Sequence, residues 1–277
     1  MPSSSKPPWH RTPPATRGSA TGRLVSSSSS VKVVCSVVTG ELYLPETPSP
    51  GSAAVAHCAA RAPRVVGVFA ELLRQPGVEE VLELRSAFGF LAFHGGSLEE
   101  ETDTIARAAA ASAGASLYAV LQPAELRWHI PSADVDPEAS DALSRFLDHV
   151  EVAVALHGYG RVGWWTTLLA GGSNRALAGD LRRRVEAALP GYEVVDDLSA
   201  IPRALRGTHP DNPVNRPRHG GVQLELPPRV RGLGPYWDEH PHETRPTAAL
   251  VEALGSVAEA WLYARDNAAT TSDVRPI

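Results

Sequence analysis

An apolar run from Phe88 to Phe93 ends abruptly at His94-Gly95-Gly96, and this stretch constrains the fold more than any other. A short apolar run of this kind is typical of a parallel strand that is buried on both faces. The two glycines allow a tight turn after the strand, and Glu99 then lies at or near the start of the next predicted helix. Ligands bind beyond the carboxyl ends of strands in open α/β sheets. The stretch therefore predicts that His94 and Glu99 belong to one binding site.

A second apolar run, Val152 to His157, also ends in a histidine, and Gly158 and Gly160 follow it. With Glu99 and His94, His157 completes a His/Glu/His set. Catalytic zinc sites commonly use three such protein ligands and leave a fourth position for water. The pattern alone also fits histidines that are simply hydrogen-bonded at strand ends, and it does not separate these two interpretations.

The segment Gly220 to Leu226 supplies a further carboxylate. Strand alternation places Gln223 and Glu225 on one face and the apolar residues on the other. Near a metal, Glu225 suits a general base that takes a proton from a zinc-bound water and returns it to a leaving amine. An edge strand with a solvated outer face would give the same pattern.

Strands alternate with helices from about residue 64 to residue 265. In the helix predicted over 173–189, for example, leucines and a valine recur four residues apart on one face. The predicted helices cover 65–73, 102–113, 138–150, 173–189 and 246–265, and the predicted strands cover 78–85, 89–94, 116–120, 126–130, 152–157, 166–170, 192–195 and 221–226. This alternation predicts an α/β fold with an open mixed, largely parallel sheet and helices on both faces.

The ends of the chain differ from this middle part. Residues 1–62 are rich in serine and proline and predict a disordered arm, residues 63–266 a single folded domain that contains the predicted metal site, and residues 267–277 a flexible tail. Cys35 and Cys58 both fall in the arm, and two cysteines cannot form a four-cysteine zinc site. No clear signal peptide or apolar stretch of about 20 residues is present, so we expect a cytoplasmic protein that does not enter a membrane. The net charge of −5 argues against a general nucleic-acid binder.

Arginines are concentrated in the second half of the domain. Residues 161–231 hold 11 arginines and 7 acidic residues, although the whole chain is negative. A guanidinium binds a carboxylate through two parallel hydrogen bonds. We therefore expect Asn215 and Arg216 to bind a carboxylate of the substrate, with a salt bridge inside the loop as the alternative for Arg216.

Five segments occur in an order that resembles the poly-γ-glutamate hydrolase family, including its bacteriophage enzymes. They are Phe93-His94-Gly95-Gly96-Ser97-Leu98-Glu99, Leu126-Arg127-Trp128-His129-Ile130-Pro131-Ser132, Ala155-Leu156-His157-Gly158, Asn212-Pro213-Val214-Asn215-Arg216 and Gly220-Gly221-Val222-Gln223-Leu224-Glu225. The resemblance covers about residues 64 to 265. It implies a zinc carboxypeptidase-like fold with the metal at strand ends.

The resemblance also implies roles for individual residues. His94, Glu99 and His157 match the zinc ligands of the family, and Glu225 matches the carboxylate that activates water. Two departures are visible. Ser97 replaces a third glycine of the phage enzymes, and the Asn215-Arg216 pair follows His157, whereas the carboxylate-binding pair of zinc carboxypeptidases precedes the third ligand.

We therefore expect a zinc-dependent amidohydrolase that cleaves γ-glutamyl amide bonds of a small or polymeric substrate through a metal-activated water. One alternative is the same metal site acting on another amide, such as a cell-wall peptide or an N-acyl amino acid. The other is a non-enzymatic binding protein on a hydrolase-like scaffold. His129 either lines the site or caps a strand, and the segment from His240 to Glu243 is expected to be a solvated loop. The sequence assigns no role to His209, His219 or Arg175.

Overall fold

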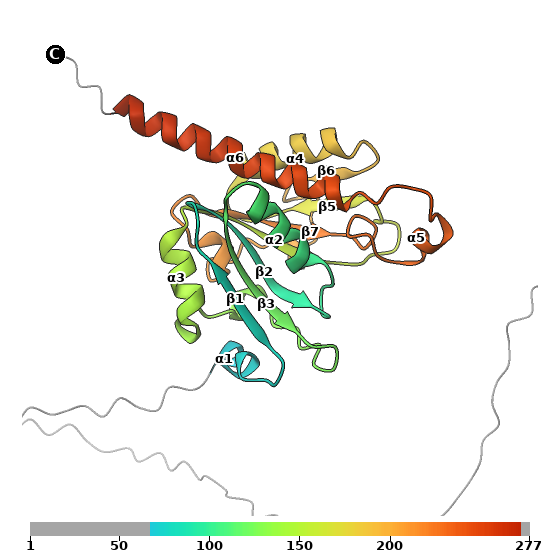
Figure 1. Ribbon diagram of the computed structural model, residues 1–277, viewed down its shortest axis with the longest axis horizontal. Helices are drawn as coiled ribbons and strands as arrows, with labels where there is room; N and C mark the ends of the chain where they lie inside the picture. Colours follow the sequence, from blue (N-terminus) through green and yellow to red (C-terminus); the bar gives the residue numbers. More distant parts are fainter. Residues whose placement is uncertain (1–66, 273–277) are drawn as a thin grey trace, which may run out of the picture. The chain divides into compact units, whose positions relative to one another are not determined.

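The computed structural model describes residues 67–272, and seven strands in this range form one sheet (Figure 1). The strand order is β1-β3-β2-β4-β7-β5-β6. The strands are β1 (Glu79–Glu83), β2 (Phe88–Gly96), β3 (Ser116–Gln122), β4 (Val152–Gly158), β5 (Thr167–Ala170), β6 (Glu193–Val195) and β7 (Gly221–Leu226). The central four, β3, β2, β4 and β7, are parallel, β1 and β5 join this group antiparallel, and β6 runs parallel to β5. The predicted open mixed, largely parallel sheet is confirmed.

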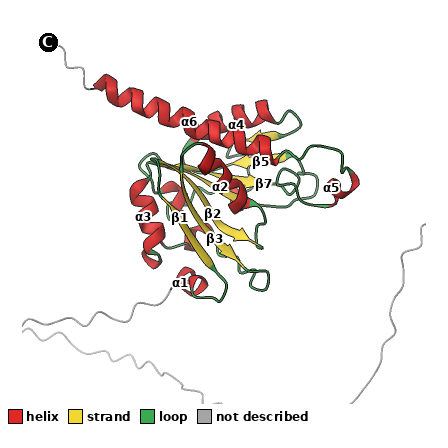
Figure 2. Ribbon diagram, in the orientation of Figure 1, coloured by secondary structure: helices red, strands yellow, loops and turns green. Residues whose placement is uncertain are grey.

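Helices cover both faces of the sheet (Figure 2). One face packs against α2 (Thr102–Ser112), α4 (Arg175–Ala188) and α6 (Thr247–Ser272), and the other against α1 (Val68–Leu73) and α3 (Asp141–His149). Shorter helices are α5 (Pro235–Glu239) and the 3₁₀ turns Ser132–Asp134, Pro137–Ala139, Arg203–Leu205 and Pro213–Asn215. The prediction of helices on both faces is confirmed.

Two hydrophobic clusters occupy the two faces because side chains alternate along each strand. Phe90 and Val154 belong to the cluster beside α2, α4 and α6, and Leu91 and Ala155 belong to the cluster beside α1 and α3. All four side chains are fully buried. Burial of one large apolar side chain contributes about 1.5–3 kcal/mol, so these two layers hold the strand ends in place.

Helix starts differ in two places from the prediction. The helix predicted from residue 173 begins instead at Arg175 as α4, and Asn174 caps it, because its side chain accepts the Leu177 N–H. The helix predicted over 138–150 is divided at Ser140, which has an extended backbone and accepts the Leu143 N–H as the N-cap of α3.

The strand predicted over 126–130 is wrong. Its backbone is bound by side chains and not by a neighbouring strand: Gln122 bonds both the N–H and the carbonyl of Trp128, and the Ile130 carbonyl bonds His94. The last helix continues beyond the predicted end at Arg265 to Ser272.

The predicted arm over 1–62, with Cys35 and Cys58, lies outside the described residues, and the boundaries of the domain stay predictions. Within residues 67–272, no helix has both the length and the apolar character of a membrane span.

The strand order places a crevice between β2 and β4. The chain passes from β2 through α2 to β3 on one side, whereas β4 lies on the other side of β2 and is followed in the sheet by β7. Such a reversal of strand order separates the loops at the carboxyl ends of two neighbouring strands. His94 on β2 and His157 on β4 lie at these ends.

Candidate metal centre and its cavity

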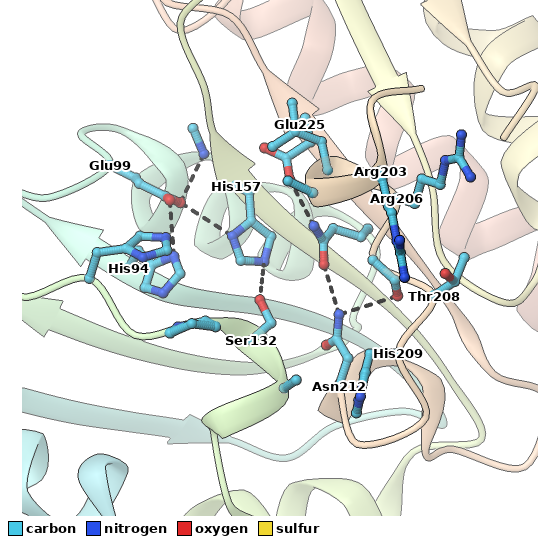
Figure 3. A pocket seen from close by; sticks show the side chains of 18 of the residues that line it. His94, Glu99, Ser132, His157, Arg203, Arg206, Thr208, His209, Asn212 and Glu225 are labelled. Atoms are coloured by element: carbon cyan, nitrogen blue, oxygen red, sulfur yellow. Dashed lines mark hydrogen bonds and ion pairs between the residues drawn. The ribbon is translucent and has the colours of Figure 1, made fainter. Parts of the chain in front are cut away.

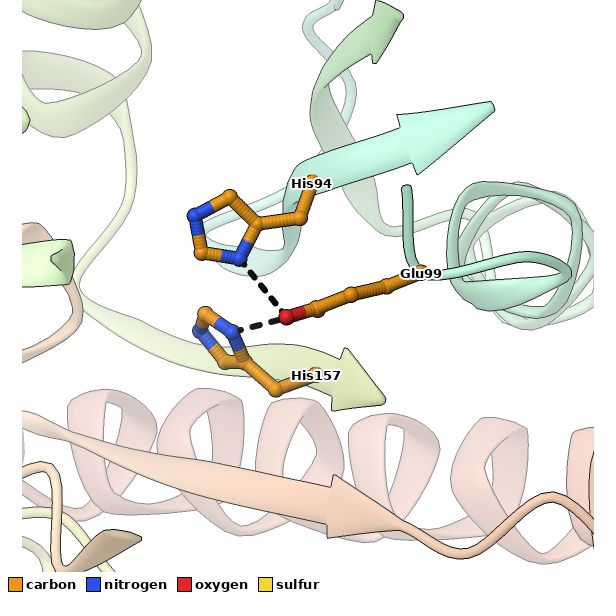
Figure 4. A group of neighbouring side chains, drawn as sticks. All are labelled: His94, Glu99 and His157. Atoms are coloured by element: carbon orange, nitrogen blue, oxygen red, sulfur yellow. Dashed lines mark hydrogen bonds and ion pairs between the residues drawn. The ribbon is translucent and has the colours of Figure 1, made fainter. Parts of the chain in front are cut away.

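The structure brings His94, Glu99 and His157 together at this crevice (Figure 4). One ligand atom from each residue lies within 4.8 Å of the others, and the side chains are buried. The Glu99 carboxylate points between the two imidazoles. Its Oε1 lies 2.9 Å from His94 Nδ1 and its Oε2 lies 3.4 Å from His157 Nδ1. Within the described part of the chain this is the one group of at least three such residues that could hold a metal ion.

A bulge in β2 places His94 in this group. Ala92 pairs with Ala119 and Gly95 with Leu121, so β2 has one residue more than β3 at this point. Strict alternation would direct neighbouring residues to opposite faces, and a bulge breaks that alternation and re-aims a side chain. Phe93 packs in the cluster beside α1 and α3, and the adjacent His94 still reaches the His157 ring, with centroids 5.1 Å apart.

The second nitrogen of each imidazole has its own partner. His94 Nε2 lies 2.8 Å from the Ile130 carbonyl oxygen, and His157 Nε2 lies 3.4 Å from Ser132 Oγ. A carbonyl oxygen can only accept, so His94 donates from Nε2 to Ile130, and Nδ1 is the nitrogen that faces Glu99. Metal-binding histidines are typically oriented in this way by a partner on the other nitrogen.

These residues fit a divalent metal ion. Two histidines and one glutamate are a donor set of catalytic zinc sites, in which tetrahedrally arranged ligand atoms lie about 3.3 Å apart. The distances from Glu99 to the two histidines are close to that value. Burial alone would raise the pKa of the Glu99 carboxyl, but His157 and His94 together hold that pKa well below its usual value. The Gly158 N–H donates to Oε2 at 2.9 Å and fixes the carboxylate further.

Glu225 lies beside the group, on β7. It pairs in register with His157 of β4, and the two side chains therefore point to the same face of the sheet. Because β7 lies between β4 and β5, the alternative of a solvated edge strand is wrong. Glu225 is buried, and burial raises the pKa of its carboxyl. Gln223 Nε2 donates to Glu225 Oε1 at 2.7 Å.

A cavity of about 740 Å³ connects these residues (Figure 3). His94, Glu99 and His157 lie at one side of it, and Arg203 and Arg206 at the other. The Arg206 Nε donates to the Ile201 carbonyl at 2.9 Å, which fixes the direction of its side chain. The remaining lining residues are His129, Pro131, Ser132, Ala133, Gly158, Ala204, Leu205, Gly207, Thr208, His209, Pro210, Asn212, Gln223 and Glu225.

Asn215 and Arg216 are not among the described residues that line this cavity. The Asn215 side chain hydrogen-bonds to backbone groups. Its Nδ2 donates to the carbonyls of Gly207 and His209, and its Oδ1 accepts the Ser173 N–H. The Arg216 guanidinium is 3.7 Å from Asp211 at the surface. The loop salt bridge considered for Arg216 is therefore present.

The four remaining histidines that the sequence analysis named fall into two groups. His129 and His209 line the cavity, and the His129 ring centroid is 4.6 Å from that of His94. Burial lowers the pKa of His129. His219 is not a lining residue and lies 3.8 Å from Glu151, whereas His240 bonds the Tyr236 carbonyl through Nδ1.

Arg175, the first residue of α4, binds backbone carbonyl groups through its guanidinium. Its guanidinium donates to the backbone carbonyls of Ala170, Gly171, Gly172 and Asp196. It therefore joins the end of β5 to the segment after β6.

Sequence reasoning did not single out Arg203, Arg206 or the buried Arg231. Arg231 donates to the Glu100 carbonyl at 2.6 Å, next to the candidate ligand Glu99, and lies against Gly158. The surplus of arginine in residues 161–231 was the one signal for these residues, and it does not tell which arginine faces a cavity.

Comparison with known proteins agrees with this geometry. The sequence model of a family described as poly-gamma-glutamate hydrolase matches residues 70–235. The SPbeta prophage-derived UPF0714 protein YoqZ of Bacillus subtilis (strain 168) is 32% identical over 139 residues, which are 49% of this chain and 47% of YoqZ. The chain thus spans about half the length of this curated relative.

Two solved structures share the fold. A bacteriophage poly-gamma-glutamate hydrolase aligns with a TM-score of 0.53 and 25% identity, over 70% of this chain and 94% of its own. The zinc-free form of YNDL aligns with a TM-score of 0.51 and 24% identity, over 65% of this chain and 88% of its own.

Proposed function

This chain belongs to the poly-γ-glutamate hydrolase family, and from that premise we propose that it is a zinc-dependent amidohydrolase that cleaves γ-glutamyl amide bonds. The observation that carries the proposal is the buried group of His94, Glu99 and His157 at one side of a cavity that Glu225 also lines. A binding protein would not require a carboxylate beside this group. The same geometry favours hydrolysis over the alternative of a non-enzymatic scaffold.

His94, Glu99 and His157 are the residues that would hold the metal. A zinc ion in such a site supplies a Lewis acid for the substrate carbonyl and lowers the pKa of a bound water to about 7. The chain itself keeps the three ligands oriented through Ile130, Ser132 and the Gly158 N–H.

Glu225 is proposed as the group that moves the proton. It accepts a proton from the attacking water as the C–O bond forms, and it donates that proton to the amide nitrogen as the C–N bond breaks. The products are a carboxylic acid and an amine, and Glu225 returns to its starting state. Because burial raises the pKa of Glu225, its carboxyl is better suited to both accepting and donating a proton near neutral pH.

The arginines at the other side of the cavity are proposed to select an anionic substrate. A γ-linked glutamate carries a free α-carboxylate beside each amide bond, and a guanidinium binds a carboxylate with two parallel hydrogen bonds. Arg203 and Arg206 are among the residues that line the cavity, whereas the sequence had predicted Asn215 and Arg216 for this role. Replacement of Arg203 or Arg206 by Ala should raise KM more than it lowers kcat. If Arg216→Ala raises KM and the other two do not, the carboxylate site returns to Arg216.

Metal analysis tests the ligands and the base. Purified protein should contain about one zinc, and His94→Ala or His157→Ala should lose it while the helical content is retained. Glu225→Gln should keep the metal and lose turnover. Unchanged metal content in both histidine variants would remove the ligand assignment, and full activity of Glu225→Gln would remove the base.

A panel of amides tests the substrate. Poly-γ-glutamate, a short γ-glutamyl peptide, an α-linked polyglutamate, a cell-wall peptide and an N-acyl amino acid are incubated with the zinc-loaded protein and with chelator-treated protein. We expect metal-dependent cleavage of the γ-linked members. Cleavage confined to the cell-wall peptide or the N-acyl amino acid would assign the same metal site to that other amide, and no cleavage of any member would overturn the proposal.

A further inference from the structure

We propose that Asn212 and Gln223 are positioning residues that orient Glu225 as a proton acceptor. They also connect Glu225 to the side of the cavity that carries Arg203 and Arg206. The inference rests on the function proposed above. It adds two amide side chains to the reaction, neither of which would touch the metal or the scissile bond.

The three side chains form a continuous buried chain (Figure 3). Asn212 Nδ2 donates to Gln223 Oε1 at 2.7 Å, and Gln223 Nε2 donates to Glu225 Oε1 at 2.7 Å. Asn212, Gln223 and Glu225 are 2%, 5% and 3% exposed. A buried amide that loses a partner leaves a costly unpaired group, so each member of the chain restricts its neighbours.

Backbone groups fix the direction of every bond in this chain. Asn212 Nδ2 also lies 3.3 Å from the Gly207 carbonyl, which can only accept, and Asn212 Oδ1 receives the Val214 N–H, which can only donate. The Asn212 amide therefore has one orientation. Because Asn212 presents a donor, Gln223 must present its oxygen to Asn212 and its NH₂ group to Glu225.

This direction matters for the chemistry. An NH₂ group can only donate, so it holds Glu225 Oε1 as an acceptor and favours the carboxylate over the carboxylic acid at that atom. The reversed Gln223 amide would place an oxygen against the carboxylate and favour the protonated form. Gln223 therefore presents a donor to Glu225 Oε1 and restricts the rotamer of Glu225 at the cavity.

These hydrogen-bonded side chains also contact the segment that carries Arg203 and Arg206. Gly207 follows the Arg203–Leu205 turn and Arg206, and a Cβ at Gly207 would lie 2.5 Å from the Cβ and the Oε1 of Gln223. The segment that carries Arg203 and Arg206 thus packs directly on the side chain that orients Glu225. This packing connects the segment with the side chain that bonds Glu225.

Three variants test the inference on the zinc-loaded full chain. Gln223→Met keeps the length and removes the donor, Asn212→Asp keeps the acceptor for Val214 and removes the donor to Gln223, and the third variant combines both. Asn174→Asp is the control, because Asn174 likewise accepts a backbone N–H and donates through Nδ2, in this case to the His219 carbonyl, and neither residue lines the cavity.

We expect Gln223→Met and Asn212→Asp each to lower kcat about 10- to 100-fold, as outer partners of catalytic groups typically do. KM and zinc content should change by less than about threefold, and Asn174→Asp should keep kcat. Because Asn212 acts through Gln223, the double variant should be no slower than Gln223→Met alone. Thermal unfolding of all variants is measured in parallel, since a purely structural role would lower the melting temperature and leave kcat near the wild-type value.

The outcomes separate the two proposals. If wild-type protein cleaves no amide of the panel, the proposed function fails and this inference fails with it. If the wild-type protein is active but Gln223→Met keeps kcat within twofold, loses its zinc, or adds its effect fully to that of Asn212→Asp, the inference alone is overturned.

Discussion

Gly207→Ala tests the proposed role of Gln223 with one added methyl group. This methyl group is disfavoured by the backbone conformation of residue 207 and would also clash with the Gln223 side chain. Gly207 has φ = +60°, in the left-handed region that L-residues rarely adopt. The added Cβ would also lie 2.5 Å from Gln223 Oε1 and 2.6 Å from its Cδ. Real contacts of this kind are essentially never shorter than 3.0 Å, and the neighbour is a buried side chain with two fixed hydrogen bonds.

The two restrictions can be added for the free energy of unfolding. The left-handed backbone costs an alanine about 1–2 kcal/mol, and forcing an extra carbon into a packed interior costs about 1–3 kcal/mol. We expect Gly207→Ala to destabilise the protein by about 2–5 kcal/mol. The displaced Gln223 should also lower kcat about 10- to 100-fold in the fraction that remains folded.

Gly114→Ala separates the two contributions. Gly114 has φ = +61°, and a Cβ there meets nothing within 4 Å. This variant therefore carries the backbone cost alone, about 1–2 kcal/mol, and should keep full activity. Urea unfolding followed by circular dichroism gives both free energies, and turnover is measured on the zinc-loaded proteins. Equal destabilisation by the two variants, or wild-type kcat in Gly207→Ala, would refute the reasoning about Gln223.

Two further predictions concern the frame around the site. Arg231→Met should weaken zinc binding about 10- to 100-fold, because Arg231 bonds the Glu100 carbonyl next to the proposed ligand Glu99. Excess zinc should restore turnover. An unchanged zinc affinity, measured by competition with a chelator, would contradict this prediction. Gly89→Ala should destabilise the domain by about 1–3 kcal/mol, because its Cβ would lie 2.4 Å from the Phe146 ring. Gly191→Ala, where nothing lies within 4 Å, is the control in urea unfolding, and equal stability of the two would rule out the proposed clash.

The sequence alone determined the order of most strands and helices along the chain, and the strand ends at which polar residues gather. An apolar run that stops at a histidine and a glycine is a local pattern, because burial of the strand and the turn after it depend on neighbouring residues. His94, His157 and Glu225 could therefore be predicted at the carboxyl edge of a parallel sheet. Their order along the chain also indicated the family that the comparisons then showed.

Only the tertiary structure decided which side chains face the cavity. The bulge in β2 re-aims His94 through pairing with β3, which strand alternation cannot anticipate. Several arginines lie in the loops after β6. Which of them lines the cavity depends on how the backbone of these loops packs on Gln223 and Asn215, and the residue type alone does not reveal it. This is why the sequence favoured Arg216, whereas the fold places Arg203 and Arg206 at the cavity and uses Asn215 to hold the backbone beside them.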